Sequence, residues 1–193
     1  MSRSGERGTG TADRVVVRRE TRETRIRVAL AVGEGRADVR TGEAFLDHML
    51  VTLARYAGFD LVVKGRGDLR HHLIEDVAIC VGAAFAALLP ATDARFGDRT
   101  MPMDDALVHA ALDAGGRPYY RGRLPSRIYE HWMRSFADNA RATLHLRVLR
   151  GTDRHHIVEG AFKALGFAVR DAFVDTGAVF STKGGVALRV EEA

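Results

Sequence analysis

Two clusters of the same composition could carry chemistry in this chain: His71-His72-Leu73-Ile74-Glu75 and His155-His156-Ile157-Val158-Glu159. Each places a glutamate three residues after the second of two adjacent histidines. Imidazole nitrogen and carboxylate oxygen together suit a first-row divalent metal such as manganese, iron or zinc. A single histidine pair is often only the solvated face of a helix, but two copies with identical spacing predict a duplicated metal site.

The two clusters lie within a longer repeat. Asp47-His48 precedes the first cluster and Glu130-His131 precedes the second, with 23 positions from His48 to His71 and 24 from His131 to His155. In each half a helical stretch follows the first histidine, and then come a β-rich run, a turn, the cluster and a second helix. An internal repeat of this kind indicates two copies of one supersecondary unit related by a pseudo-twofold axis. It pairs His48 with His131, which gives six histidines and two glutamates in equivalent places.

Helix geometry limits how these ligands can share metal ions. Side chains at i and i+3 or i+4 lie on one face of a helix, so Glu75 can share a metal with His71 or with His72. Adjacent histidines lie about 100° apart around the axis and therefore reach two metals more naturally than they chelate one. We expect two metal ions, each taking histidines from both kinds of cluster, and neighbouring subunits could supply some of them. A structural zinc site would more often use cysteine and close at four ligands.

The composition predicts a soluble, cytoplasmic protein. A chain of 193 residues can bury a sizeable core, and its 46% hydrophobic and 28% charged residues are ordinary for a globular protein. Its single cysteine, Cys80, lies in an apolar run and is expected to be a buried, inert thiol. We find neither an uninterrupted apolar run of membrane-spanning length nor a signal-peptide core.

The basic charge does not indicate a nucleic-acid-binding protein. The formal net charge is +4, and the calculated isoelectric point is about 9.6. Many of the arginines fall in the N-terminal segment or alternate along predicted strands, and no basic motif interleaved with aromatic residues is present. The arginines could equally serve a small phosphorylated ligand.

Periodicity predicts an α+β fold, an internally duplicated two-layer unit in which each half has a mixed sheet with helices on one face. We expect a disordered N-terminal tail at 1–12, a first half-repeat at 13–100 and a second at 101–193, together forming one compact catalytic unit. The predicted strands are at 15–17, 25–30, 37–40, 59–64, 106–112, 118–121, 143–148 and within 179–190. The predicted helices are at 49–56, 77–89, 132–141 and 160–174. The connections that we expect are a hairpin turn at 33–35, a turn at 65–68 and an irregular segment at 90–102. The strands at 106–112 and 118–121 are expected to form a pair around 115–117.

Further motifs run in order along the chain. They include Thr21-Arg22-Glu23-Thr24, Phe45-Leu46-Asp47-His48, Gly67-Asp68-Leu69, Arg95-Phe96-Gly97, Pro102-Met103-Asp104-Asp105, Gly116-Arg117-Pro118 and Ser181-Thr182-Lys183-Gly184. With these motifs and the two clusters, the chain resembles the imidazoleglycerol-phosphate dehydratase family from about Arg18 to Gly185. The resemblance implies dehydration of D-erythro-imidazoleglycerol phosphate to imidazole acetol phosphate in histidine biosynthesis.

The same resemblance implies a site. Two manganese ions, or other divalent metals, are expected per active site, with the ligands His48, His71, His72, Glu75, His131, His155, His156 and Glu159. The metals bind the substrate imidazole as imidazolate, which makes the neighbouring hydroxyl a better leaving group, and Glu23 is the expected general base. The expected substrate-binding residues are Arg95, Arg117, Lys163, Ser181 and Lys183. The family also implies self-association into a 24-subunit shell with sites between subunits, and no nucleic-acid or membrane partner.

Departures from the family pattern leave two alternatives open. The turn before His71 is about three residues shorter than expected, Asp153 replaces a usual asparagine, and Ala114 and Gly115 replace a Leu-Ser pair. One alternative is a non-catalytic metal-binding paralogue that forms the same assembly. The other is a two-metal hydrolase of a small phosphorylated substrate.

Overall fold

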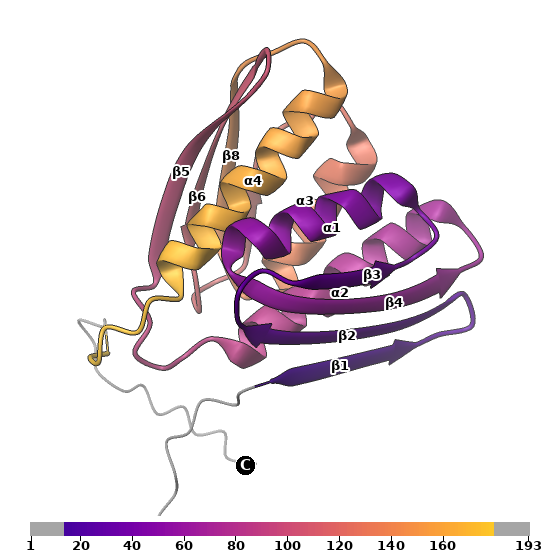
Figure 1. Ribbon diagram of the computed structural model, residues 1–193, viewed down its shortest axis with the longest axis horizontal. Helices are drawn as coiled ribbons and strands as arrows, with labels where there is room; N and C mark the ends of the chain where they lie inside the picture. Colours follow the sequence, from indigo (N-terminus) through magenta and orange to yellow (C-terminus); the bar gives the residue numbers. More distant parts are fainter. Residues whose placement is uncertain (1–13, 180–193) are drawn as a thin grey trace, which may run out of the picture.

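The chain forms two four-stranded sheets with four helices between them, as seen in a computed structural model that describes residues 14–179 (Figure 1). The first half contains β1 (Val15–Glu20), β2 (Thr24–Val32), β3 (Ala37–Arg40), α1 (Ala44–Ala57), β4 (Phe59–Gly67) and α2 (Arg70–Leu88). The second half contains β5 (Phe96–Met103), β6 (Ala106–Asp113), β7 (Tyr119–Arg121), α3 (Arg127–Asn139), β8 (Thr143–Arg150) and α4 (Arg154–Ala172).

The two halves have the same topology. The sheets are ordered β1-β2-β4-β3 and β5-β6-β8-β7, and in each the last-named pair is parallel while the other pairs are antiparallel. The element order is therefore three strands, a helix, a strand and a helix, repeated once. This confirms the prediction of an internally duplicated α+β fold with a mixed sheet in each half.

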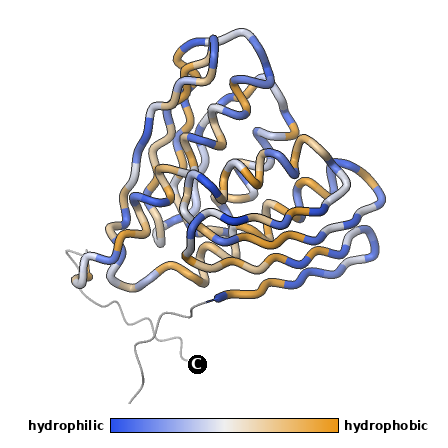
Figure 2. The backbone as a smooth tube through the Cα atoms, viewed as in Figure 1, coloured by the Kyte–Doolittle hydropathy of each residue, from blue (hydrophilic) through white to orange (hydrophobic). Residues whose placement is uncertain are grey.

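The helices form the interior layers of the molecule. α1 and α2 pack on the first sheet, α3 and α4 pack on the second, and the two layers meet where α2 contacts α3 and α1 contacts α4. The buried hydrophobic residues of the sheets and helices form one core. In Figure 2 hydrophobic colour runs along the strands and helices, and hydrophilic colour marks many of the turns. Phe85 on α2 and Phe136 on α3 meet edge to face with ring centroids 5.4 Å apart, a contact that contributes about 0.5–1.5 kcal/mol beyond burial of its area.

Two glycines permit the helix crossings. A Cβ atom on Gly82 of α2 would lie 2.5 Å from the carbonyl oxygen of Phe136 on α3, and one on Gly166 of α4 would lie 2.7 Å from Cβ of Tyr56 on α1. Both glycines stand 11 positions after the first histidine of their cluster. The same close approach of two helices is therefore repeated in each half, and it sets the distance between their ligand-bearing ends.

Several expected boundaries are wrong. Residues 65–67, expected in a turn, continue β4, and residues 96–102, expected in an irregular connection, belong to β5. The segments at 33–35 and 115–117 do not form hairpins, because β4 lies between β2 and β3 and β8 lies between β6 and β7. β3 pairs in parallel with β4, and β7 pairs in parallel with β8. In each case a helix connects the two strands, and local turn signals do not reveal such a crossover.

The remaining expectations concern the ends of the chain and the long apolar helix. The predicted tail at 1–12 lies outside the described residues, as does nearly all of the predicted strand within 179–190, and the expected division at 100 and 101 falls inside β5. α2 is long and apolar enough to cross a membrane by length and composition, but 61% of that window is buried inside the protein, as in a core helix. Cys80 of α2 is buried as expected, and burial raises the pKa of its thiol to about 11.

Candidate metal centre

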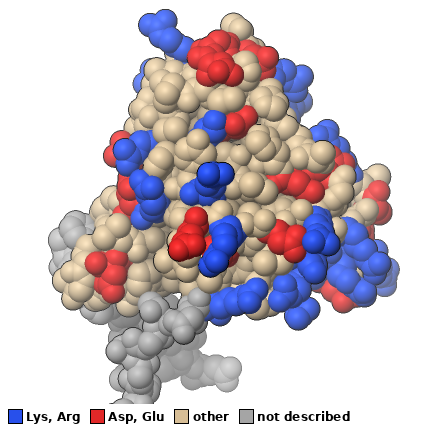
Figure 3. Space-filling view, viewed as in Figure 1, with Lys and Arg blue, Asp and Glu red and all other residues tan. Residues whose placement is uncertain are grey.

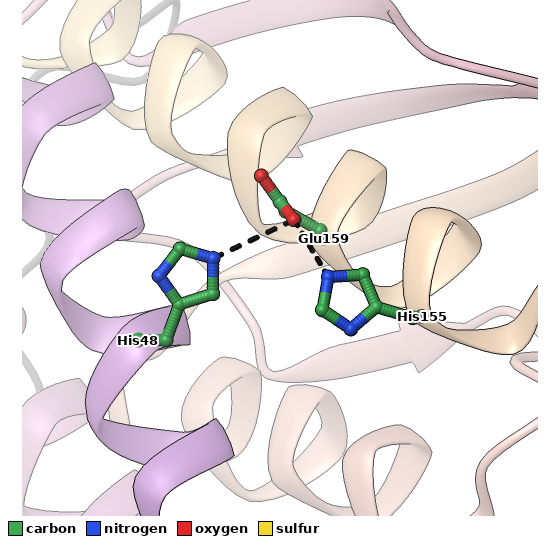
Figure 4. Close-up of side chains that lie close together, drawn as sticks. All are labelled: His48, His155 and Glu159. Carbon is green, nitrogen blue, oxygen red and sulfur yellow. Dashed lines mark hydrogen bonds and ion pairs between the residues drawn. The ribbon is translucent and has the colours of Figure 1, made fainter.

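One group of ligand atoms joins the two halves of the chain (Figure 4). His48 projects from α1, while His155 and Glu159 project from α4 toward it. Glu159 Oε2 lies 3.1 Å from His155 Nε2 and 3.5 Å from His48 Nε2, and one ligand atom from each residue lies within 4.8 Å of the others. The packing of α1 on α4 therefore brings a histidine of the first half to the cluster of the second.

The pseudo-equivalent contact lies between α3 and α2. His131 Nε2 is 3.4 Å from Glu75 Oε1. His71 stands one helical turn before Glu75, as His155 does before Glu159, and its ring centroid lies 4.1 Å from that of His72. Each half thus contributes one histidine to the cluster of the other half, as the internal repeat implies.

The second histidine of each pair faces other carboxylates. His156 Nδ1 lies 2.8 Å from Asp105 Oδ1, and His156 Nε2 lies 3.3 Å from Asp104 Oδ2. Both aspartates belong to the β5–β6 turn, and Figure 3 shows acidic side chains gathered at the top of the molecule where this turn lies. The ring planes of His155 and His156 are 89° apart, so the two imidazoles point in different directions.

His72 has a similar environment in the first half. Its Nδ1 lies 2.9 Å from Asp68 Oδ1 and 3.5 Å from Glu23 Oε2, and the three side chains form a second group of potential ligand atoms within 4.8 Å of one another. The eight expected ligands therefore do not converge on one point. The structure brings together His48, His155 and Glu159, and separately His131 and Glu75, while His72 and His156 are directed elsewhere.

Hydrogen bonds and burial set the protonation of these groups. The hydrogen bond with Asp105 raises the pKa of His156, and the one with Asp68 raises the pKa of His72. Burial alone would raise the pKa of Glu159. The hydrogen bond from Lys163, whose Nζ lies 2.9 Å from Oε1, the charge of Lys163 and the nearby His48 outweigh burial and lower this pKa. Glu159 is therefore ionised at neutral pH although only 6% of its surface is exposed.

This donor set fits a divalent first-row metal. The group formed by His48, His155 and Glu159 offers two imidazole nitrogens and a buried, ionised carboxylate on two packed helices. Such a mixture of nitrogen and oxygen ligands suits manganese, iron or zinc, and three protein ligands leave coordination positions for a substrate.

The expected substrate-binding residues divide into two places. Lys163 lies against the metal centre through its ion pair with Glu159, and its Nζ also lies 2.9 Å from Met103 Sδ. Arg95 precedes β5, whereas Asp104 follows it, and an eight-residue strand separates its ends by roughly 26 Å. A single chain therefore cannot hold one small substrate between its second cluster and Arg95.

Arg95 and Arg117 share a corner of the second sheet. Asp113 binds Arg95 through two contacts, Nε to Oδ1 at 2.6 Å and Nη2 to Oδ2 at 3.1 Å, and this hydrogen bonding raises the pKa of Arg95. A Cβ on Gly116 would lie 3.8 Å from Arg95 Nη2, so the backbone next to Arg117 passes close to this guanidinium group. Ser181 and Lys183, expected at the same phosphate, lie outside the described residues.

Sequence reasoning did not assign the carboxylates that hold the second histidines. Asp68 and Asp105 occur in motifs that the sequence shows, but nothing in their spacing links Asp105 to His156, which follows it by 51 positions. Asp68 could have been found, because it stands four residues before His72 at the start of a predicted helix.

Comparisons with known proteins identify the family of the chain. Residues 41–169 match the family model of imidazoleglycerol-phosphate dehydratase. The chain belongs to the imidazoleglycerol-phosphate dehydratase family. It is 45% identical over 172 residues to the protein of that name from Desulforudis audaxviator, covering 81% of this chain and 88% of that one. It is 43% identical over 201 residues to the Acidothermus cellulolyticus protein, covering 95% and 98%.

Solved structures of imidazoleglycerol-phosphate dehydratases have the same fold. The Pyrococcus furiosus structure superposes with a TM-score of 0.80 at 39% identity, over 88% of this chain and 100% of that one. The Staphylococcus aureus structure gives 0.76 at 27% identity, over 84% and 99%. The family is metal-dependent, and membership supports dehydration of imidazoleglycerol phosphate in histidine biosynthesis, the activity of a hydro-lyase.

Proposed function

We propose that this chain converts D-erythro-imidazoleglycerol phosphate to imidazole acetol phosphate with two divalent metals, manganese foremost, at each active site. The observation that carries the proposal is the contact of His48 with His155 and Glu159, repeated by His131 with Glu75. Two equivalent sets of nitrogen and oxygen donors on four packed helices suit two equivalent metal ions.

The ligands of the proposed centre are the histidines and glutamates of the repeat. They are His48, His71, His72, Glu75, His131, His155, His156 and Glu159. When bound, the metals act as Lewis acids toward the substrate imidazole and hold it in place. The carboxylates of Asp68 and Asp105 hold the Nδ1 atoms of His72 and His156, so the two Nε2 atoms are the proposed ligating positions. Asp104, whose Oδ2 lies 3.3 Å from His156 Nε2, faces the same position.

Glu23 is the proposed general base. Its carboxylate lies 3.5 Å from His72 Nδ1, and 57% of its side-chain surface is exposed, so it is accessible to a substrate that lies beside His72. An oxygen of this carboxylate accepts the proton from the carbon next to the one that loses its hydroxyl group. The resulting enol then becomes the ketone of the product.

The phosphate is proposed to bind to Arg95, Arg117, Lys163, Ser181 and Lys183. Guanidinium and ammonium groups suit this role, because they donate charge-assisted hydrogen bonds to phosphate oxygens. In one chain Arg95 lies at the end of the second sheet opposite His156, so residues of different subunits must complete each site. This separation supports sites that lie between subunits. We propose that the subunits assemble as a 24-subunit shell, and we place the enzyme in the cytoplasm.

An assay of the purified chain distinguishes the proposal from its alternatives. The protein is stripped with a chelator and incubated with imidazoleglycerol phosphate with and without added manganese, and the products are identified by mass spectrometry. Imidazole acetol phosphate formed only with manganese is the expected result. Release of inorganic phosphate would indicate the two-metal hydrolase, and no product from the fully loaded protein would indicate the non-catalytic paralogue.

A further inference from the structure

The backbone of Glu23 is fixed on both sides, while its exposed carboxylate faces His72 Nδ1 at 3.5 Å. Its N–H donates to Thr21 Oγ1 at 3.1 Å, and its carbonyl oxygen accepts from the N–H of Asp68 at 3.0 Å. The residue lies in the turn between β1 and β2, opposite the first turn of α2 that carries His72. The turn therefore determines where the carboxylate can reach.

The hydrogen bonds of this turn lead to a carboxylate on α2. Thr24 Oγ1 donates to Asp76 Oδ2. A carboxylate only accepts, so the hydroxyl proton of Thr24 is committed and the O–H of Thr21 must donate to Thr24 Oγ1, 3.1 Å away. Both acceptor positions of Thr21 Oγ1 then serve the N–H groups of Glu23 and Thr24, at 3.1 and 3.0 Å. The donors and acceptors of these hydrogen bonds therefore follow one direction, from the backbone N–H of Glu23 through Thr21 and Thr24 to the carboxylate of Asp76.

The carboxylate of Asp76, the last acceptor in this series of hydrogen bonds, is buried and paired. Only 8% of the residue is exposed, and its second oxygen forms an ion pair with Arg19, whose Nε lies 2.9 Å away. A buried carboxylate is strongly unfavourable unless it is paired in this way. Because Asp76 follows Glu75 directly on α2, the turn that holds Glu23 is tied to the same helical turn as a proposed metal ligand.

The second half of the chain has the same hairpin without this network. Gly160 occupies the place of Asp76, and Ala106, the first residue of β6, occupies the place of Thr24. The carboxylate of the β5–β6 turn, Asp105, is itself bonded, because its Oδ2 accepts from the N–H groups of Thr152 and Asp153 at 2.7 and 3.2 Å. The first half instead combines the exposed carboxylate of Glu23, which faces His72, with a buried anchor at Asp76.

We infer that Thr24 and Asp76 are positioning residues for Glu23, which fix its turn relative to His72 and thereby set the rate of proton removal. The inference rests on the proposed role of Glu23 as the base. A displacement of about 1 Å from the productive geometry can cost roughly 100-fold in rate. Loss of the anchor should therefore slow proton transfer while the metal ligands stay in place.

The test compares two replacements of one hydroxyl in the full-length, manganese-loaded protein. Thr24→Val removes the hydroxyl but keeps the branched shape, and Thr24→Ser keeps the hydroxyl. We expect Thr24→Val to lower kcat roughly 10- to 100-fold, with KM and manganese content unchanged. The kinetic isotope effect with substrate deuterated at the carbon that loses its proton should rise, since proton transfer becomes more rate-limiting. Thr24→Ser should restore most of kcat, and Thr100→Val, on the exposed face of β5, serves as the matched control.

The outcomes separate the inference from the function it rests on. Wild-type kcat and isotope effect in Thr24→Val, together with a lowered kcat in Glu23→Gln, would overturn the positioning role and keep the base. Unchanged kcat in Glu23→Gln would overturn the base and the inference with it. If Thr24→Val does not fold, Thr21→Val breaks the same chain of hydrogen bonds at an exposed position. A wild-type kcat and isotope effect in that variant would equally refute the inference.

Discussion

Replacing Glu159 with glutamine should remove one metal site and weaken the metal-free fold. The two carboxylate oxygens meet Lys163 Nζ at 2.9 Å, His155 Nε2 at 3.1 Å and His48 Nε2 at 3.5 Å. Glutamine keeps the shape but removes the negative charge. The largely buried ammonium group of Lys163 then loses its anionic partner and keeps its contacts with Met103 Sδ and the ring of Tyr56.

The size of the effect follows from these contacts. A hydrogen bond between charged groups contributes about 1.5–3 kcal/mol. For a chain of this length, about 1 kcal/mol shifts the melting temperature by roughly 2–4 °C, so the metal-free variant should melt about 3–12 °C below wild type. Manganese at 100 times its Kd stabilises each intact site by about 2.7 kcal/mol. The variant lacks this gain at one site, so its deficit should widen to roughly 5 kcal/mol.

Thermal unfolding with and without manganese measures both effects, and metal analysis counts the ions. We expect two manganese ions per chain in wild type and one in Glu159→Gln. Asp171→Asn is the control. Asp171 lies on α4, as Glu159 does, and the change breaks its 2.7 Å ion pair with Arg99 of β5 without touching a proposed ligand. It should lose some metal-free stability and keep the full response to manganese. Two tightly bound ions per chain in Glu159→Gln would refute the ligand assignment.

Three further results are expected. Glu23→Gln should lower kcat roughly 10²- to 10⁴-fold with unchanged manganese content, as measured by steady-state turnover and metal analysis. Asp105 raises the pKa of His156, and a ligating imidazole must be neutral. As the pH is lowered, calorimetry should therefore show the manganese affinity of wild type beginning to fall while the pH is still above about 6.5. In Asp105→Asn the fall should begin at a lower pH. The hydrogen bond from Arg36 lowers the pKa of Asp60 to about 2, so this contact adds stability above pH about 3.9 that is lost as pH falls toward 2. Denaturant unfolding between pH 5 and pH 2 should show that loss in wild type and a weaker one in Asp60→Asn.

The repeat and its helices can be predicted from the sequence because helix geometry imposes their spacing. His155 and Glu159 are four positions apart and therefore face the same way, which the structure shows as a 3.1 Å contact. Gly82 and Gly166 recur at the same distance from their clusters because each meets another helix at close range. The spacing within each cluster is a local signal that one sequence reveals, whereas the role of the two glycines depends on contacts that only the fold shows.

Strand β5 could not be predicted, because tertiary contacts decide its inward residues. Gly97 faces α4, where a Cβ atom would lie 2.0 Å from the carbonyl oxygen of Ala168. Arg99 also points inward and pairs with Asp171 of α4 at 2.7 Å. The usual alternation of apolar and polar residues is therefore missing from a strand that is regular in the fold.

The carboxylates that hold His156 and the turn of Glu23 could not be predicted from the sequence either. The contact of His156 with Asp105 depends on the β5–β6 turn meeting the start of α4, and the link from Thr24 to Asp76 spans 52 positions. Neither distance has a periodic signature. The separation of Arg95 from the clusters also required the fold, because it follows from the direction of β5.

A manganese titration of the metal-free chain, with turnover of imidazoleglycerol phosphate followed at each addition, tests the central claim most directly. The claim is that the duplicated histidine and glutamate clusters form a two-metal dehydratase centre. We expect turnover to be absent without metal, to rise with occupancy and to reach its plateau at two manganese ions per chain. Full turnover in the metal-free protein, or none at two bound ions per chain, would contradict it.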